Sequence, residues 1–385
     1  MKKKIFIIAG EKSGDLLGSK ILSKIDKDTF DIYGIGGQLM KEEGLNSIFP
    51  MEELSVMGIF EILPKIFNLL KRIRETAKYI IDLQPDIVLT IDSPDFCFRV
   101  MKLVKKYDTN NKIKKIHFIA PSVWAYRKNR AQKIAKIYDL LFCILPFEPP
   151  YFEKYGLKTI FVGHPIFDTN STEYNFNLKE NTYNKDSKIM SITVGSRIGE
   201  VKRLLPIVIN IIRKLNSKYK FDYNILATEY TYHTIKEILN KQNINYINII
   251  KNNEEKNNII KKSVLAIAKS GTNTLELAGF SIPMVVMYKF NFLTNIIAKH
   301  IQKKADKKFA TIINIINNKQ IIPECLLQNC NEENIFNEIV KLMDNEKLRI
   351  NQVKQNIETL KILGYHNNNS SAIKIVNKIE ELLNV

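Results

Sequence analysis

The chain has 385 residues, of which 45% are hydrophobic, and a formal net charge of +18. This length and composition indicate a globular chain and not a disordered one, and they allow two domains, each with its own core. The charge favours anionic partners, which include nucleic acid, acidic lipid and phosphorylated substrates, but it does not choose among them.

The N-terminal segment MKKKIFIIAGEKSGD predicts a short buried strand, a turn framed by Gly10 and Gly14, and a helix that begins at Leu16. This order is typical of a phosphate-binding loop. The turn is nevertheless acidic, with Glu11 and Asp15, and it has neither G-x-G-x-x-G spacing nor the lysine and Ser/Thr of a P-loop. The residues alone therefore do not assign a phosphate to this turn.

Short apolar strands alternate with helical stretches along the chain, which indicates parallel α/β architecture. The predicted strands are 4–9, 31–36, 86–92, 115–121, 140–145 and 159–164, then 189–196, 223–228, 246–250, 264–271 and 283–289. An Asn-rich polar stretch without periodicity, 169–187, separates the two series and predicts a linker. We expect an α/β fold of two Rossmann-like, doubly wound domains facing a central cleft, where such sheets bind ligands.

The domain boundaries follow from this pattern. We expect an N-terminal domain over 1–168 and a C-terminal domain over 188–346. Helices are predicted near 332–345, 346–362 and 370–383. The segment 347–385 is expected to pack back on the first domain.

Two strand–turn–helix segments in the second half predict an anion site. Gly195 and Ser196 form a tight turn before a helix with Arg197 near its start, which offers backbone N–H groups and a guanidinium to an anion. The segment from Ser270 repeats this order, and Glu276 follows one helical turn later. Two such turns suit a diphosphate, and the carboxylate suits a ribose diol. The alternative is that Arg197 and Glu276 only lie on solvated helix faces.

In the first half, the strand 86–92 delivers Asp92 and Asp95 to its carboxyl end, where carboxylates are candidates for a general base. The alternative is an N-cap role for the helix near Phe96. Trp124 and Arg127 follow another strand and could hold a sugar and a phosphate, or else belong to an interface or the core.

Histidines and cysteines add less. His117 is expected in the core, and His164 suggests a hinge or cleft position where the chain leaves the first domain. The cysteines are Cys97, Cys143, Cys325 and Cys330, and they form no C-x-x-C pair. We interpret them as buried reduced thiols of a cytosolic protein and expect no metal site.

Residues 60–81 predict an amphipathic helix with an apolar stripe and several lysines and arginines on the opposite side. This pattern suits an interfacial helix on anionic lipid, although a helix packed on the sheet gives the same pattern. Residues 290–308 are a weaker candidate. The N-terminal apolar run is too short for a signal peptide, and no segment approaches the roughly 18–20 apolar residues that span a bilayer. We therefore expect a cytoplasmic protein with peripheral membrane contact.

Ten segments in register resemble the bacterial lipid-A-disaccharide synthases. They are AGEKSGD (9–15), MEELSVMG (51–58), IDSPDF (91–96), APSVWAYR (120–127), LPFE (145–148), VGHP (162–165), GSRIGEV (195–201), SGTNTLE (270–276), PMVVMYK (283–289) and IIPECLLQ (321–328). The resemblance implies a GT-B glycosyltransferase that joins UDP-2,3-diacylglucosamine to 2,3-diacylglucosamine 1-phosphate, giving a β-1,6 disaccharide and UDP. It also implies peripheral contact with the inner membrane of Gram-negative bacteria, and a homodimer that exchanges C-terminal segments.

The resemblance assigns roles to residues of this sequence. It implies an inverting reaction without a cofactor or metal, with Asp95 as the base and Glu11 and Asp92 as rivals. The expected UDP contacts are Gly195, Ser196, Arg197, Ser270, Gly271, Thr272, Asn273, Glu276 and Asn314. The expected acceptor contacts are Gly10, Ser13, Gly14, Ser122, Trp124, Arg127 and His164. Asp15 is expected to cap the first helix.

The sequence departs from the family pattern at three places, one of which is Val194, where proline is common in the family. Lys12 stands where the family has a small residue. The family's Leu-Pro-Asn and Ala-Gly-Arg stretches correspond here to residues 312–314 and 317–319. A lysine in place of that arginine loses bidentate phosphate contact.

Three other functions are compatible with parts of the sequence. A UDP-sugar epimerase or another GT-B transferase would share the second-half site but would not need a basic amphipathic helix. A nucleic-acid-binding protein would need basic residues interleaved with aromatics along one groove, whereas the lysines are scattered through both halves. An NAD-dependent oxidoreductase is disfavoured because neither opening strand is followed by G-x-G-x-x-G.

Overall fold

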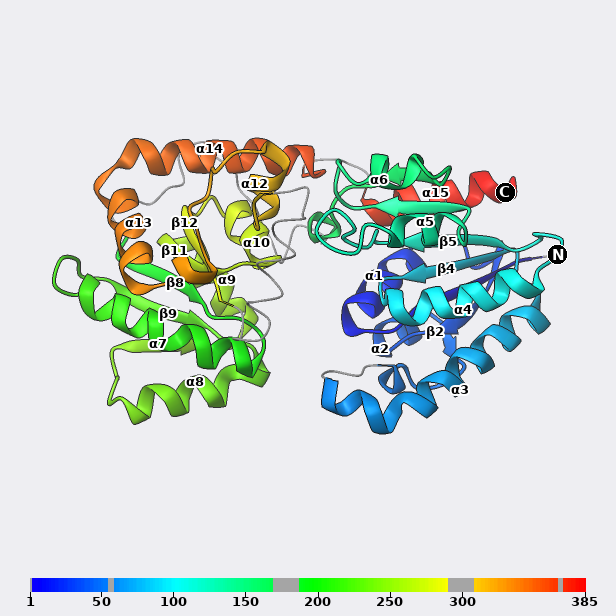
Figure 1. Cartoon of the computed structure of the whole chain (residues 1–385), viewed down its shortest axis with the longest axis horizontal. Helices are drawn as coiled ribbons and strands as arrows, with labels where there is room; N and C mark the ends of the chain where they lie inside the picture. The colour runs from blue at the N-terminus through cyan, green and yellow to red at the C-terminus, as the bar shows by residue number, and fades with distance from the viewer. Residues whose placement is uncertain (1, 55–58, 169–186, 290–307, 366–369) are drawn as a thin grey trace. The chain divides into compact units, whose positions relative to one another are not determined.

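The computed structural model of the chain divides into two compact units, one of residues 1–168 with 366–385 and one of residues 169–365 (Figure 1). The structure describes residues 2–54, 59–168, 187–289, 308–365 and 370–385, with no side-chain description for 59–66. Most of the predicted linker, and residues 290–307 of the second lipid-binding candidate, lie outside the described residues.

The first unit contains a parallel sheet in the order β3-β2-β1-β4-β5-β6-β7. Its strands are β1 (Lys3–Ala9), β2 (Phe30–Ile35), β3 (Asn46–Ser47), β4 (Ile87–Ile91), β5 (Lys114–Phe118), β6 (Leu140–Cys143) and β7 (Lys158–Phe161). The central strands are continuous apolar runs, and consecutive residues of β1 and β4 are buried, as expected when both faces of a sheet are covered. The strand order reverses between β1 and β4, which is where open α/β sheets bind ligands.

The second unit contains a parallel sheet in the order β10-β9-β8-β11-β12-β13. Its strands are β8 (Ile189–Thr193), β9 (Asp222–Leu226), β10 (Ile247–Ile250), β11 (Ser263–Lys269), β12 (Met284–Tyr288) and β13 (Glu324–Leu326). The order has the same arrangement as that of the first six strands of the other sheet, and its switch point lies between β8 and β11. The prediction of two doubly wound parallel α/β domains is confirmed.

Helices connect the strands in both units. Those of the first unit are α1 (Lys12–Leu22), α2 (Gln38–Glu42), α3 (Ile59–Leu83), α4 (Pro94–Tyr107), α5 (Arg130–Ala135), α6 (Pro149–Glu153) and α15 (Ser371–Leu383). Those of the second unit are α7 (Ile198–Leu215), α8 (Glu229–Lys241), α9 (Asn253–Lys262), α10 (Asn273–Gly279), α12 (Ile312–Asn317), α13 (Glu332–Asp344) and α14 (Glu346–Ile362). Short 3₁₀ turns occur at Met51–Glu53, Pro165–Phe167 and Leu327–Asn329.

The first helix begins earlier than predicted, at Lys12 instead of Leu16. Ser13 and Gly14 are therefore helical and do not belong to the turn. A Cβ at Gly14 would lie 3.3 Å from the Ala9 Cβ and 3.5 Å from the Ile91 oxygen, so the glycine permits α1 to pack closely on the sheet. A glycine that is needed for close helix packing cannot be distinguished in the sequence from a glycine that is needed for a turn, and the helix start was therefore predicted too late.

The C-terminal helices belong to different units. Helix α14 contacts α10, α12 and α13 of the second unit, whereas α15 contacts α1 of the first. Asp168 ties α15 to the end of the first domain, because its carboxylate accepts hydrogen bonds from the Ser371 N–H and hydroxyl. Of the segment 347–385, only the part that contains α15 thus packs on the first domain.

The amphipathic helix predicted over 60–81 is α3. In its described part the apolar stripe, with Ile73, Ala77 and Ile80, is buried in the domain core. Arg72 forms ion pairs with Glu53 and Glu75, at 2.8 and 2.9 Å. The ordinary packed-helix interpretation therefore holds for this part of α3.

Candidate active site

A polar pocket of about 620 Å³ lies at the switch point of the second sheet. Its walls come from the residues after β8, β9 and β11 and from helix α9. Parallel strands end at the same sheet edge, so turns distant in sequence meet there. Six of the predicted UDP contacts line it, namely Gly195, Ser196, Gly271, Thr272, Asn273 and Glu276.

The turn after β8 is held by a buried carboxylate. Gly195 has φ +104°, in the region that favours glycine, and a Cβ there would lie 2.4 Å from Glu200 Oε2. The same oxygen accepts the Ser196 N–H at 3.1 Å, and Glu200 Oε1 lies 3.1 Å from Lys269 Nζ. Glu200 is 5% exposed. It thus fixes the turn at the start of α7 and connects it to the end of β11.

A second set of contacts fixes the residues after β11. Thr193, the last residue of β8, accepts hydrogen bonds at its hydroxyl oxygen from the Lys269 N–H at 3.1 Å and from Asn273 Nδ2 at 2.7 Å. Thr272 is the residue before α10, and Glu276 lies in the first turn of that helix. The two strand–turn–helix segments therefore form one connected wall of the pocket.

Three predicted UDP contacts do not line this pocket. Arg197 is exposed at the N-cap of α7, and Ser270 lies beside the lining residue Gly271. Asn314 is fully buried: its amide nitrogen donates to the Ile322 oxygen and to Glu324, and its oxygen accepts the N–H groups of Ile321 and Ile322. The prediction that Asn314 contacts UDP does not fit this geometry, because its hydrogen bonds hold the loop after α12.

Sequence reasoning missed the wall supplied by α9. Lys256 and Asn257 line the pocket, although the polar sequence of this helix is typical of a solvated surface. Burial lowers the pKa of Lys256, while the charges of Glu276 and Glu229 act in the opposite direction. Lys256 places a cation in the same pocket as the Glu276 carboxylate.

In the first unit, the acidic loop after β1 and the loop after β4 meet at the switch point. A Cβ at Gly10 would lie 2.6 Å from the Ser93 hydroxyl oxygen, so the Gly10 backbone lies close against the Ser93 side chain. Glu11 is exposed at the N-cap of α1, and Ser13 is exposed in its first turn. The structure thus brings together two of the motifs assigned to the acceptor.

Asp92 and Asp95 differ in their surroundings. Asp92 and Ser93 both have left-handed backbone angles, with φ of +49° and +43°, a strained pair that is commoner at functional sites than elsewhere. Burial raises the pKa of Asp92. Asp95 lies in the first turn of α4, is exposed, and pairs with the Arg130 guanidinium. Ser93 is the N-cap residue, so neither aspartate caps this helix.

Asp15 caps a different helix from the one predicted. Its carboxylate accepts the N–H groups of Gly37, Leu39 and Met40 at 2.8–3.1 Å, which lie at the start of α2. Asp15 is buried, and its side chain joins α1 to α2. The prediction that it caps the first helix is wrong, because its carboxylate accepts N–H groups at the start of α2 instead of those at the start of α1.

The remaining acceptor candidates separate into exposed and packed residues. Ser122 and Arg127 are exposed. Trp124 donates its indole N–H to Glu148 at 3.3 Å, an intradomain contact, and burial raises the pKa of Glu148 to about 7. His164 is buried, accepts the Ile166 N–H, and has a pKa lowered to about 4 by burial. It does not line the polar pocket at the switch point of the second sheet.

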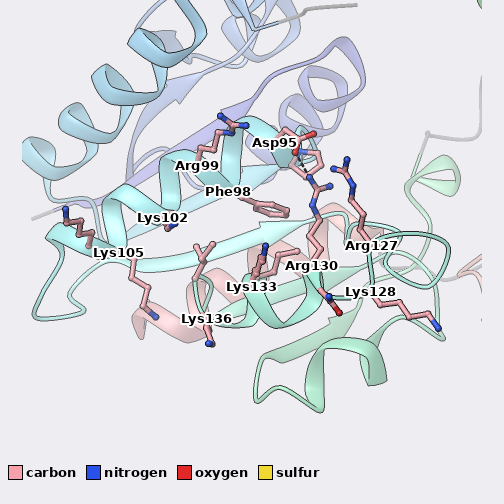
Figure 2. A pocket seen from close by; sticks show the side chains of 15 residues that line it. Asp95, Phe98, Arg99, Lys102, Lys105, Arg127, Lys128, Arg130, Lys133 and Lys136 are labelled. Atoms are coloured by element: carbon pink, nitrogen blue, oxygen red, sulfur yellow. Dashed lines mark hydrogen bonds and ion pairs between the residues drawn. The ribbon is translucent and has the colours of Figure 1, made fainter. Parts of the chain in front are cut away.

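A second pocket, of about 990 Å³, lies on the first unit and includes Asp95 and Arg127 (Figure 2). It lies between α4 and α5, and most of the charged side chains on it are lysines and arginines. The lysines that looked scattered in the sequence are therefore partly gathered by the fold.

Comparison with known proteins identifies the family. A family model described as lipid-A-disaccharide synthetase matches residues 5–378. Lipid-A-disaccharide synthases of Rickettsia bellii (strain OSU 85-389) and Rickettsia prowazekii (strain Madrid E) are 41% and 39% identical over 372 and 373 residues. These matches cover 95% and 96%, respectively, of both chains. The chain belongs to the lipid-A-disaccharide synthase family.

Membership of the lipid-A-disaccharide synthase family makes the chain a glycosyltransferase of lipid A biosynthesis. Solved structures with a similar fold include UDP-GlcNAc 2-epimerase from Neisseria meningitidis bound to UDP-GlcNAc (TM-score 0.63, 14% identity, all of both chains). Another is MurG from Acinetobacter baumannii (TM-score 0.59, 13% identity, 99% of this chain and 100% of the other). The expected family, enzyme class and GT-B fold are confirmed.

The loop that departs from the family pattern retains a glycine-like backbone. Asn318, one of the residues in place of Ala-Gly-Arg, ends α12 with a left-handed φ of +47°. Asparagine is the commonest substitute for glycine at this position of a helix.

Within the described residues, no helix is long and apolar enough to cross a membrane.

Proposed function

We propose that the chain transfers 2,3-diacylglucosamine from its UDP conjugate to the 6-hydroxyl of 2,3-diacylglucosamine 1-phosphate. The products are the β-1,6-linked disaccharide 1-phosphate and UDP. Family membership supports glycosyl transfer in lipid A synthesis. The observation that carries the nucleotide half of this proposal is the polar pocket at the switch point between β8 and β11.

UDP would bind in this pocket of the C-terminal domain, residues 188–346. The turn at Gly195 and Ser196 and the residues after β11 would face the diphosphate, and Lys256 and Lys269 supply positive charge. Glu276 is the candidate for the ribose hydroxyls. Fixed donors of this kind stabilise a leaving phosphate because they need no reorganisation when charge develops. Arg197, exposed at the edge of the turn, would meet the phosphate from solvent.

The acceptor would bind to the N-terminal domain, residues 1–168, with Asp95 as general base. Asp95 would take the proton of the acceptor 6-hydroxyl while that oxygen attacks the anomeric carbon of the donor. The bond from this carbon to the diphosphate oxygen breaks, and UDP leaves with the electron pair. One displacement inverts the α-linked donor to a β-linked product. Glu11, Ser13 and Ser122 are exposed polar side chains on the same domain and are candidate contacts for the acceptor sugar.

The proposal includes peripheral attachment to the inner membrane, since both substrates carry acyl chains. Helix α3 presents Phe67, which is 80% exposed, beside the exposed Lys71 and Arg74. An exposed aromatic among cations suits the interface of an anionic bilayer. We also propose a homodimer in which C-terminal segments are exchanged, which cross-linking through α15 would test.

Incubation of the purified chain with both substrates in detergent tests the function. We expect UDP and a tetra-acylated disaccharide 1-phosphate in equal amounts by mass spectrometry. UDP formed without the disaccharide, or conversion of the donor to an epimer without acceptor, would contradict the proposed transfer.

A further inference from the structure

The pocket between α4 and α5, here called the basic groove, carries a large excess of positive charge (Figure 2). Four lysine or arginine side chains come from α4 and five from residues 127–136. Asp95 is the one carboxylate among the described lining residues, and it pairs with Arg130. Like charges at close range raise the free energy of the protein until an anion neutralises them.

Two cations of the basic groove, one on each of its bordering helices, are not used by the fold. Lys102 on α4 and Lys133 on α5 are exposed and form no ion pair with any described residue. Figure 2 shows them on the two helices that border the groove, with Phe98 between those helices. By contrast, Arg130 pairs with Asp95 and lies 5.8 Å above the Phe98 ring. Lys102 and Lys133 are therefore available to an external anion.

The floor of the basic groove is apolar. Phe98, Ile134 and Ile137 line it beneath the cations. A simple solvated helix face explains exposed lysines, but it does not explain why two helices place them around one concave apolar surface. A ligand that is both anionic and partly apolar would pair with the lysines and arginines of the groove and also cover its apolar residues.

We infer that the basic groove binds the phosphate monoester of the lipid acceptor, with Lys102 and Lys133 as its principal contacts. This inference rests on the proposed function and assigns the acceptor's charged end to a site. Asp95 lines the same groove, so one bound sugar would present its reacting hydroxyl to this carboxylate and its phosphate to the lysines. A monoester carries about 1.5 to 2 negative charges at pH 7, more than a phospholipid diester, which suits the density of cations here.

Equilibrium binding of 2,3-diacylglucosamine 1-phosphate to the full chain in detergent micelles tests the inference, with Lys102→Gln/Lys133→Gln as the variant. We expect the Kd to rise about tenfold or more, because two charge-assisted contacts are lost. The control is Lys24→Gln/Lys41→Gln, which removes two exposed lysines of the same unit outside the groove. Its Kd should equal that of the wild type.

The same lipid without its phosphate separates phosphate recognition from a structural effect. The wild type should bind this lipid with a Kd about tenfold higher than that of the phosphorylated lipid. The Kd of the groove variant for the lipid without phosphate should equal that of the wild type. Equal losses with both lipids, or an unchanged Kd for the phosphorylated lipid, would overturn the inference. Loss of binding only to vesicles of phosphatidylglycerol would also overturn it, because the groove would then serve the membrane surface.

Turnover distinguishes this inference from the proposed function. If the lysines govern binding of the phosphorylated lipid but the wild type forms no disaccharide, the groove assignment stands and the transfer reaction fails. If disaccharide forms with an unchanged acceptor KM in the variant, the reaction stands and the groove assignment fails.

Discussion

Glu200 and Lys269 form a 3.1 Å ion pair that joins the turn after β8 to the end of β11, and Glu200 also accepts the Ser196 N–H. The carboxylate is nearly inaccessible to solvent, while Lys269 remains on the pocket surface. Glu200 is therefore a positioning residue that fixes the Ser196 turn and the Lys269 side chain at the proposed diphosphate site.

Glu200→Gln should weaken UDP binding about tenfold by titration calorimetry, because the Ser196 turn and Lys269 both lose a charged partner. The KM for the acceptor should not change. Glu333→Gln is the matched control, since Glu333 forms an exposed ion pair with Lys214 at 3.6 Å. Unchanged UDP affinity in Glu200→Gln would contradict the positioning role.

Asp95→Asn should lower kcat by about 10²–10⁴-fold while leaving the Kd for UDP unchanged, as expected for loss of a general base. The fold should tolerate the change because the exposed pair with Arg130 contributes only about 0–1 kcal/mol. The rate of UDP release at saturating concentrations of both substrates measures kcat.

Asp92→Asn and Asp82→Asn serve as comparisons. Asparagine accepts the left-handed backbone of residue 92, so that variant should fold, and Asp82 is exposed on α3. If Asp95→Asn kept near-normal turnover and Asp92→Asn lost it, the base would be Asp92.

Asp15→Asn should lower the free energy of unfolding by about 2–3 kcal/mol, because three backbone N–H groups at the start of α2 lose a charged acceptor. Urea unfolding followed by circular dichroism measures this difference. Asp28→Asn, an exposed change in the same unit, should leave the midpoint unaltered. Equal midpoints for both variants would show that the Asp15 contacts do not stabilise the domain.

Glu148 predicts a pH dependence of stability. Its carboxylate accepts N–H groups from Trp124, Ile144 and Leu145, which lower the pKa, but burial outweighs them and raises it from 4.5 to about 7. The folded protein therefore binds a proton more tightly than the unfolded chain between these values. The contribution of Glu148 to the free energy of unfolding is fully present below about pH 4.5 and is lost as the pH rises to about 7.

Glu148→Gln removes this titration. The stability of the wild type relative to the variant should fall by up to about 1.4 kcal/mol per pH unit across that window and stay constant above it. Urea titrations at several pH values measure the difference, with the exposed Glu42→Gln as control. Wild-type and Glu148→Gln curves that stay parallel would show that Glu148 does not retain its proton.

Much of the fold was predictable because buried parallel strands are apolar runs separated by turn signals. The missed strands, β3 and β13, are short edge strands, and β13 directly follows Pro323, so neither gives a periodic pattern. The start of α1 was misplaced because Gly14 serves close packing inside the helix, which no local rule distinguishes from a turn.

The candidate site was predictable where it lies in β–α turns, such as Gly195 and Gly271. It was not predictable where it depends on contacts between distant segments. Asn314 has a polar side chain that could contact a ligand, but its hydrogen bonds are made within its own loop. Lys256 lines the pocket although it belongs to a helix whose polar sequence is typical of a solvent-exposed surface. The gathering of lysines from α4 and α5 likewise depends on the fold.

The linkage of the product tests the central claim most directly. The purified chain is incubated with UDP-2,3-diacylglucosamine and 2,3-diacylglucosamine 1-phosphate, and the isolated lipid is examined by NMR. The account predicts a single disaccharide 1-phosphate whose new bond runs from a β-configured C1 to O6 of the acceptor. An α-configured bond, a different acceptor oxygen, or the absence of a disaccharide would contradict it.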